Sequence, residues 1–182
     1  MRKYLEWAGR EYSTRQLLVA LFFAGTAFLL AIPYLIIRSS AWLDEALGLP
    51  RFTLGSINPI VGILFSLAGG LLAFWSVYAE ARIGSGTPLP MMPTQRLVVV
   101  PPFTYCRNPM VLGTLVAYLG IGVWLGSLSA IGIVIVLAVL LLTYVKALEE
   151  KELESRFGAD YVEYKRRTPF LLPRVTRRPP DA

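Results

Sequence analysis

The chain has 182 residues, of which 55% are apolar, and a net charge of +6 from 18 lysines and arginines against 12 acidic residues. Soluble domains contain about 45–50% apolar residues, so this excess, together with long uncharged runs, indicates a membrane protein. There is no histidine and only one cysteine, Cys106, which excludes histidine-based metal sites, histidine general bases and an intramolecular disulfide.

Four segments are candidates for membrane-spanning helices, at about 16–37, 59–78, 110–125 and 128–145. A helix needs roughly 20 apolar residues to cross about 30 Å of hydrocarbon, so the third segment is slightly short. Only Gly126 and Ser127 separate the third segment from the fourth, which predicts a helical hairpin. We therefore expect an all-α integral membrane protein, a single domain over residues 1–182 with four transmembrane helices.

Basic residues gather before the first span, between the second and third spans, and after the fourth. Of the two remaining loops, one holds only Arg38 and Arg51 and the other holds no basic residue. The positive-inside rule then places both termini and the middle loop in the cytoplasm, with the protein in the inner membrane. The segment from Ser39 to Ile57, on the opposite side, is expected to lie along the membrane interface.

Small residues recur along one stripe of the second and third spans. Gly62, Ser66 and Gly70 repeat every four residues, as do Gly113 and Ala117. Such stripes let helix backbones approach closely where lipid supplies no hydrophobic drive, so they predict tight packing of these helices.

The middle loop ends in Arg107-Asn108-Pro109, directly before the third span. Proline suits the first position of a helix because its missing N–H would be unpaired there, and asparagine is a favoured N-cap. From physical chemistry alone, this tripeptide is an anchor at the membrane edge followed by a helix cap.

Glu149 and Glu150 follow the fourth apolar run. On a continuing α-helix Glu149 shares a face with the apolar residues Leu153 and Phe157, and a carboxylate there needs a partner because an unpaired buried charge is costly. We expect that partner to be Arg107 or a cationic ligand. Glu150 lies about 100° further round the helix and can pair with Lys146, or both acids can simply be solvated.

Two motifs in this half of the chain resemble those of one known family. Residues 97–113 read Leu-Val-Val-Val-Pro-Pro-Phe-Thr-Tyr-Cys-Arg-Asn-Pro-Met-Val-Leu-Gly, and residues 149–164 fit Glu-Glu-x-x-Leu-x-x-x-Phe-Gly-x-x-Tyr-x-x-Tyr. Both are similar to the isoprenylcysteine carboxyl methyltransferase and phospholipid methyltransferase family, and Gly-Thr-Pro-x-Pro at 86–90 resembles its bacterial members. The resemblance covers about residues 84–174.

The resemblance implies an enzyme that transfers a methyl group from S-adenosyl-L-methionine to a lipid or lipid-like acceptor, with no metal. The implied site lies in the cytoplasmic segments 82–109 and 146–174. Its implied catalytic residues, as orienting charges, are Arg107, Glu149 and Glu150. Its implied cofactor-binding residues are Gln95, Arg96, Leu97, Val98, Phe103, Tyr105, Asn108, Pro109, Met110, Val111 and Glu149.

Three positions depart from the family pattern, and the last of them bears on the acceptor. Asn108 stands where many relatives have histidine, Val111 where tyrosine is frequent, and Val145 where the prenylcysteine enzymes have an acceptor-binding arginine. We expect carboxyl O-methylation of a prenylcysteine-type acceptor, with N-methylation of an ethanolamine phospholipid as the alternative.

Two rival classes agree less well with the sequence. Membrane sterol reductases have a related carboxy-terminal architecture, but their nicotinamide dinucleotide requires more basic residues than Arg96 and Arg107 in this loop. A small transporter or a non-catalytic subunit would carry ionisable residues inside its spans, whereas here they gather at one rim. The basic carboxy-terminal residues are expected to contact lipid headgroups rather than nucleic acid.

Overall fold

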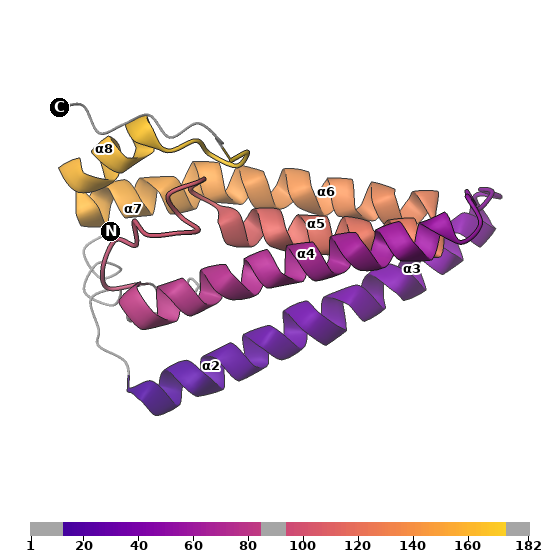
Figure 1. Cartoon of the computed structure of the whole chain (residues 1–182), viewed down its shortest axis with the longest axis horizontal. Helices are drawn as coiled ribbons and strands as arrows, with labels where there is room; N and C mark the ends of the chain where they lie inside the picture. Colours follow the sequence, from indigo (N-terminus) through magenta and orange to yellow (C-terminus); the bar gives the residue numbers. More distant parts are fainter. Residues whose placement is uncertain (1–12, 85–93, 174–182) are drawn as a thin grey trace.

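The computed structural model describes residues 13–84 and 94–173, which form five helical rods (Figure 1). Arg2, Lys3 and Arg10, the Gly-Thr-Pro-x-Pro stretch at 86–90 and the basic residues from 174 onward lie outside these ranges. The rods are made of the following elements: α2 (Thr14–Thr26), the π-helical turn η1 (Ala27–Ala31) and α3 (Ile32–Ala46); α4 (Ile57–Ala79) and the π-helical turn η2 (Glu80–Gly84); α5 (Pro109–Leu125); α6 (Leu128–Tyr144), the π-helical turn η3 (Val145–Glu149) and α7 (Glu150–Phe157); and α8 (Ala159–Arg167).

Three of these rods are long and apolar enough to cross a membrane: Arg15–Ala46, Ile57–Gly84 and Leu128–Phe157. Their outward faces expose large apolar side chains, such as Phe22 and Leu71, as expected for surfaces that contact lipid. The protein is therefore an integral membrane protein with an all-helical fold. The helix α5 is also apolar, but its 17 residues extend only about 25 Å.

The closest packing in the bundle joins α4 to α5. A Cβ atom added at Gly113 would lie 2.6 Å from the Gly69 carbonyl oxygen, and Ser66 Oγ donates a hydrogen bond of 3.1 Å to the Ala117 carbonyl oxygen. The predicted stripe is correct for Gly62 and Ser66, but Gly70 has no neighbour within 4 Å and Gly69 takes its place in the contact. An α-helix has about 3.6 residues per turn, so a stripe advances by four and then three residues, not by four each time.

At the end of the bundle opposite α8, hydrogen bonds of Asp44 connect the first rod to the hairpin between α5 and α6. Its Oδ2 accepts a hydrogen bond of 2.6 Å from Ser127 Oγ, and its Oδ1 accepts one of 3.1 Å from the Ser129 backbone N–H. The expectation that residues 39–57 lie along the interface is wrong for the first part of that segment, because α3 continues through Ala46. At the start of α6 this buried carboxylate accepts a hydrogen bond from the otherwise free Ser129 N–H. Its negative charge also interacts favourably with the helix dipole.

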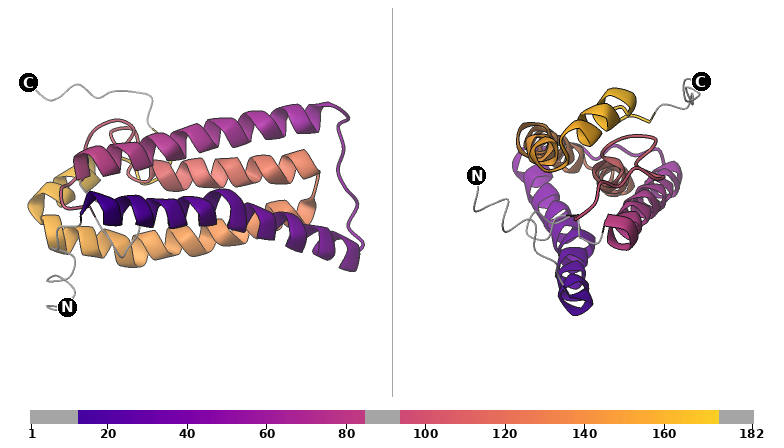
Figure 2. Two further views of the ribbon diagram at one scale, coloured as in Figure 1. Left: turned by 90° about the horizontal axis from the view of Figure 1, so that it is seen from below. Right: turned by 90° about the vertical axis from the view of Figure 1, so that its left-hand side faces the viewer.

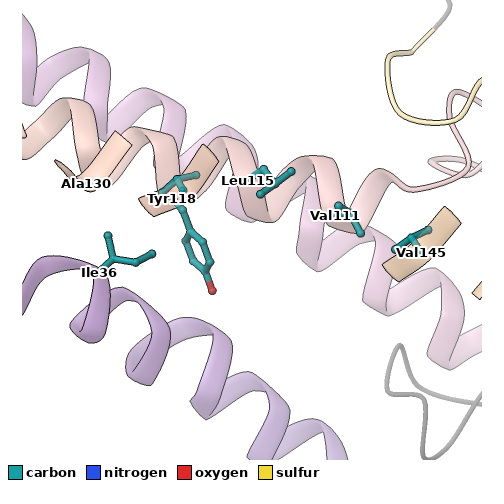
Figure 3. Packing of buried hydrophobic residues seen from close by; sticks show 7 residues of the cluster. Ile36, Val111, Leu115, Tyr118, Ala130 and Val145 are labelled. Carbon is teal, nitrogen blue, oxygen red and sulfur yellow. The ribbon is translucent and has the colours of Figure 1, made fainter. Parts of the chain in front are cut away.

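The apolar core lies between α3, α5 and α6 (Figure 3). The buried side chains labelled there are Ile36, Val111, Leu115, Tyr118, Ala130 and Val145. Tyr118 donates a hydrogen bond of 2.7 Å to the Phe28 carbonyl oxygen in η1, and beyond that turn Figure 1 shows α2 running away from α4. Next to this core is an apolar pocket of about 510 Å³, lined by side chains of the first rod, α5 and α6, among them Ile32, Thr114 and Leu137.

The bundle collects the chemically informative segments at one end. The end of α4, the loop before α5, the end of α6 and both α7 and α8 lie there in Figure 1, and Figure 2 (right) looks onto this end. Segments as far apart in the sequence as Glu80 and Lys165 are thereby brought to one site.

Candidate functional site

The loop before α5 is held in place by the helices around it. Its residues Val98 and Phe103 are buried against Ala79 at the end of α4. The Gln95 N–H donates to the Gly84 carbonyl oxygen at 2.6 Å, and Arg156 in α7 donates to the carbonyl oxygen of Thr94. Four residues that lack regular structure of their own are thus fixed by their neighbours.

The central ion pair of the site joins this loop to α7. Arg107 Nη1 lies 2.8 Å from Glu150 Oε1, and the two side chains are only 10% and 6% exposed. The other carboxylate oxygen, Glu150 Oε2, lies 2.9 Å from Lys165 Nζ of α8. The expectation that Arg107 pairs with Glu149, and Glu150 with Lys146, is therefore wrong.

The π-helical turn η3 explains why Glu150, and not Glu149, pairs with Arg107. Val145 and Glu150 are both buried and lie five residues apart, which is the spacing of one π-helical turn. On the uninterrupted α-helix that we expected, the residue beneath Val145 would have been Glu149. The extra residue rotates the following helix so that Glu150 faces the core, while Lys146 is exposed.

The residues that follow α8 close over the start of α5. Asn108 Nδ2 donates a hydrogen bond of 2.8 Å to the Phe170 carbonyl oxygen, and the Arg107 N–H donates one of 2.9 Å to that of Pro169. Helix α5 begins at Pro109 as predicted, but the Asn108 side chain makes no cap hydrogen bond. Its amide is used to hold the carboxy-terminal segment, a partner that lies 62 positions away in sequence.

The residues predicted to bind the cofactor lie at this end but differ in exposure. Val98, Phe103, Pro109 and Val111 are buried; Gln95, Leu97, Asn108, Met110 and Glu149 are half-buried; Arg96 and Tyr105 are exposed. Because the ring of Phe103 is used in the packing against Ala79, Tyr105 is the aromatic side chain of the two predicted ones that a ligand can reach. Tyr105 is 40% exposed, and its ring meets that of Trp75 edge-on at 6.4 Å between centroids.

Tyrosines of the second motif contribute hydrogen bonds and not acid–base chemistry. Tyr164 donates a hydrogen bond of 2.8 Å to the Phe103 carbonyl oxygen, which ties α8 to the loop. Burial raises the pKa of Tyr161 to about 12 and raises that of Tyr164 as well, so both hydroxyls stay protonated at neutral pH. Burial also raises the pKa of the Cys106 thiol, which keeps it in the unreactive protonated form.

A further acidic residue besides Glu149 and Glu150, Glu80, lies at this site and falls outside both recognised motifs. It begins the π-helical turn η2 at the end of α4, and its Oε2 atom is buried with no hydrogen-bond partner. Glu80 and Glu149 are close enough to interact electrostatically. Within residues 13–84 and 94–173, no ion pair includes either of them. The only sequence signal for Glu80 is a glutamate directly after an apolar run of 23 helical residues.

The described residues contain no group of three or more histidine, cysteine, aspartate or glutamate side chains placed to hold a metal ion. Arg107 Nε, like Glu80 Oε2, is buried without a hydrogen-bond partner. The site therefore offers one unused acceptor and one unused donor, both of charged groups. This combination suits an organic ligand that carries a cation and an anion.

Comparison with known proteins gives two matches. The model of a family described as phospholipid methyltransferase matches residues 57–160, which include α4 through the start of α8. The chain is also 32% identical over 80 residues to the cobalt-zinc-cadmium resistance protein CzcN of Cupriavidus metallidurans, a match that covers 44% of this chain and 37% of that protein. The chain thus spans well under half the length of this relative. No solved structure matches.

Proposed function

The chain belongs to the phospholipid methyltransferase family, and on this premise we propose that it transfers a methyl group from S-adenosyl-L-methionine to a lipid-like acceptor. Methyltransferases of this family use that cofactor, which supplies a methyl group already activated on a sulfonium. The residues of the chain then have three tasks: to bind the cofactor, to exclude water and to align the acceptor.

The observation that carries the proposal is the pair of unused charged atoms, Glu80 Oε2 and Arg107 Nε, in a site that also contains Glu149. The cofactor has cationic groups, a carboxylate, ribose hydroxyls and an adenine ring. Carboxylates suit its cations and hydroxyls, and the exposed face of Tyr105 suits its ring. The buried side chains of Val98 and Val111 supply apolar walls. Its donors and acceptors therefore fit the residues present.

The apolar pocket supports a lipid-like acceptor. Its volume of about 510 Å³ falls in the range of roughly 300–1,000 Å³ that is usual for ligand sites. Thr114 and Leu115 in its wall follow Val111 by one turn of α5, so the pocket adjoins the proposed cofactor site within the bundle. A hydrocarbon chain in this pocket would leave its polar head at the rim.

For the acceptor group itself, our first candidate is the carboxylate of a prenylcysteine-type compound. Arg107 is already paired with Glu150, so the exposed Arg96 is the loop cation that such a carboxylate would contact. The second candidate is the amine of an ethanolamine phospholipid, which the description of the family favours. Membrane lipids are its remaining expected partners.

We further propose four membrane crossings, with α5 as the short one, and both termini in the cytoplasm. The basic loop and α8 would then face the cytoplasm, where the cofactor is made and where basic residues are retained. The domain is one unit, in which the segments 82–109 and 146–174, together with Glu80 at the end of α4, hold the site.

The deciding experiment is calorimetric binding of S-adenosyl-L-methionine and S-adenosylhomocysteine to detergent-purified protein. We expect dissociation constants in the micromolar range, followed by transfer of labelled methyl to prenylcysteine or ethanolamine acceptors in vesicles. Glu149→Ala should abolish cofactor binding and leave thermal unfolding unchanged, whereas Lys151→Ala, at the exposed neighbouring position, should change neither. Folded wild-type protein that binds neither compound would contradict the proposal and favour a non-catalytic membrane protein.

A further inference from the structure

Glu80 is a charged residue that neither sequence motif explains. Its Oε2 atom is buried and accepts no hydrogen bond, although a buried carboxylate oxygen normally has a donor. A buried acceptor without a donor is costly, so its retention in the fold needs a reason.

The ionisable side chain that interacts electrostatically with Glu80 is a second acidic residue. Glu149 interacts electrostatically with Glu80, and the described residues contain no ion pair to either carboxylate. Each of the two residues belongs to a π-helical turn: Glu80 is the first residue of η2, and Glu149 is the last residue of η3. Such turns are frequent at functional sites because they redirect side chains out of the α-helical pattern. A cation that contacts both would stabilise two neighbouring carboxylates in a sheltered site.

We propose that Glu80 is a cofactor-binding residue, and that Glu80 and Glu149 together bind the α-ammonium group of S-adenosyl-L-methionine. The inference rests on the proposed function, to which it adds a residue and a binding mode.

The ammonium group of the cofactor fits Glu80 better than the sulfonium does, because only the ammonium can donate hydrogen bonds. Glu80 Oε2 lacks a hydrogen-bond donor, and an ammonium has three N–H donors whereas a sulfonium has none. Carboxylates against the sulfonium would also stabilise a charge that disappears from sulfur during transfer, which favours the ground state over the transition state. The ammonium keeps its charge throughout, so binding it orients the cofactor without that penalty.

Arg107 supplies the matching donor for the other end of the amino-acid group. Its Nε is buried without a partner, and both Arg107 and Glu80 interact electrostatically with Tyr164, which places the two charges around one side chain. The ammonium and the carboxylate of the cofactor are joined through a single carbon atom. A zwitterion of this kind needs an anionic and a cationic contact close together, and the site offers both.

The test compares three ligands in wild-type and Glu80→Gln protein by calorimetry. S-adenosyl-L-methionine and S-adenosylhomocysteine both carry the α-ammonium, whereas 5′-methylthioadenosine keeps the nucleoside and the thioether but lacks the amino-acid group. We expect Glu80→Gln to weaken the binding of S-adenosyl-L-methionine and of S-adenosylhomocysteine by a similar factor, roughly 10- to 100-fold. That factor corresponds to the loss of a hydrogen bond to a charged group, which is worth about 1.5–3 kcal/mol. Binding of 5′-methylthioadenosine should be unchanged. Glu163→Gln, at a carboxylate of α8 paired with Arg166, should leave all three affinities unchanged.

Thermal unfolding without ligand separates binding from folding. Removal of one of two carboxyl groups that repel each other should leave the unfolding temperature of Glu80→Gln equal to that of the wild type or higher. A clear fall would instead indicate a structural residue. Unchanged affinity for all three ligands would overturn the inference and leave the proposed function standing. Loss of S-adenosyl-L-methionine binding alone would overturn the ammonium assignment in favour of the sulfonium. Wild-type protein that binds none of the three would overturn both proposals.

Discussion

Arg107 Nη1 and Glu150 Oε1 lie 2.8 Å apart, and this buried ion pair joins the loop before α5 to the start of α7. Each partner belongs to a different motif of the sequence, so the pair is the point at which the two motifs meet. A third member, Lys165, extends the connection to α8 and also contacts Glu154 at 2.7 Å. One carboxylate thus organises three segments around the site.

Glu150→Ala should destabilise the protein by about 3–5 kcal/mol, because it leaves the charge of Arg107 buried without a partner. Thermal or chemical unfolding in detergent measures this directly, with the exposed Lys151→Ala as control. The double variant Arg107→Met, Glu150→Leu should recover much of the loss, since it removes both charges. A single variant as stable as the wild type would mean that the pair contributes nothing to the fold.

Gly69 and Gly70 form a matched pair of neighbouring positions for a test of helix packing. Gly69→Leu should separate α4 from α5 and lower stability by about 1–3 kcal/mol or more, because its side chain would meet the α5 backbone. Gly70→Leu should have little effect, since nothing lies within 4 Å of that position. The unfolding temperatures of the two variants, measured in the same detergent, test this difference. An equal fall in unfolding temperature for both variants would argue against the contact between α4 and α5.

Asp44→Ala should lower stability by about 1–3 kcal/mol, because it removes two hydrogen bonds and leaves Ser127 and the Ser129 N–H without their acceptor. The neighbouring exposed Glu45→Ala serves as control. Since Asp44 lies at the end of the bundle opposite the site, cofactor affinity should be unchanged in folded Asp44→Ala protein. A parallel loss of affinity would show that the two ends are coupled.

Lys165 gives a prediction for alkaline pH. Its hydrogen bonds to Glu154 and Glu150 raise the pKa of Lys165 above its ordinary value of 10.5. A raised pKa in the folded state means that the stabilisation is complete below the unfolded pKa and is lost as the pH rises through the folded one. The stability difference between wild type and Lys165→Gln should therefore be constant from pH 7 to 9 and shrink above about 10.5. Unfolding curves along this pH series test it, and a difference that is constant to still higher pH would contradict it.

Much of the fold follows from local sequence patterns. The long apolar runs predict membrane helices, the two-residue link at Gly126 predicts the hairpin, and Pro109 predicts where α5 begins, all of which the structure reproduces. The family, too, follows from two short motifs whose residues are adjacent in sequence. These features depend on composition, spacing and backbone preference, so a single chain read in order is sufficient to find them.

The identity of inward-facing residues could be predicted only to within one position. Gly69 replaces Gly70 because an α-helical stripe does not repeat at a whole number of residues. Glu150 replaces Glu149 because η3 inserts one residue into a turn, and no sequence pattern that we recognised marks that insertion. An error of one residue rotates a side chain by about 100°, which is enough to exchange a buried position for an exposed one.

The sequence by itself determined that this is a helical membrane protein of a methyltransferase family, since hydrophobic run length and motif spacing are properties of the chain. Only the tertiary structure decided which polar side chains interact: Arg107 with Glu150 in an ion pair, Asp44 with Ser127 in a hydrogen bond, and Glu80 with Glu149 electrostatically. Each of these pairs joins residues more than 40 positions apart on different elements. Their proximity depends on how whole helices pack, and this long-range geometry also placed Glu80, which belongs to neither motif, at the candidate site.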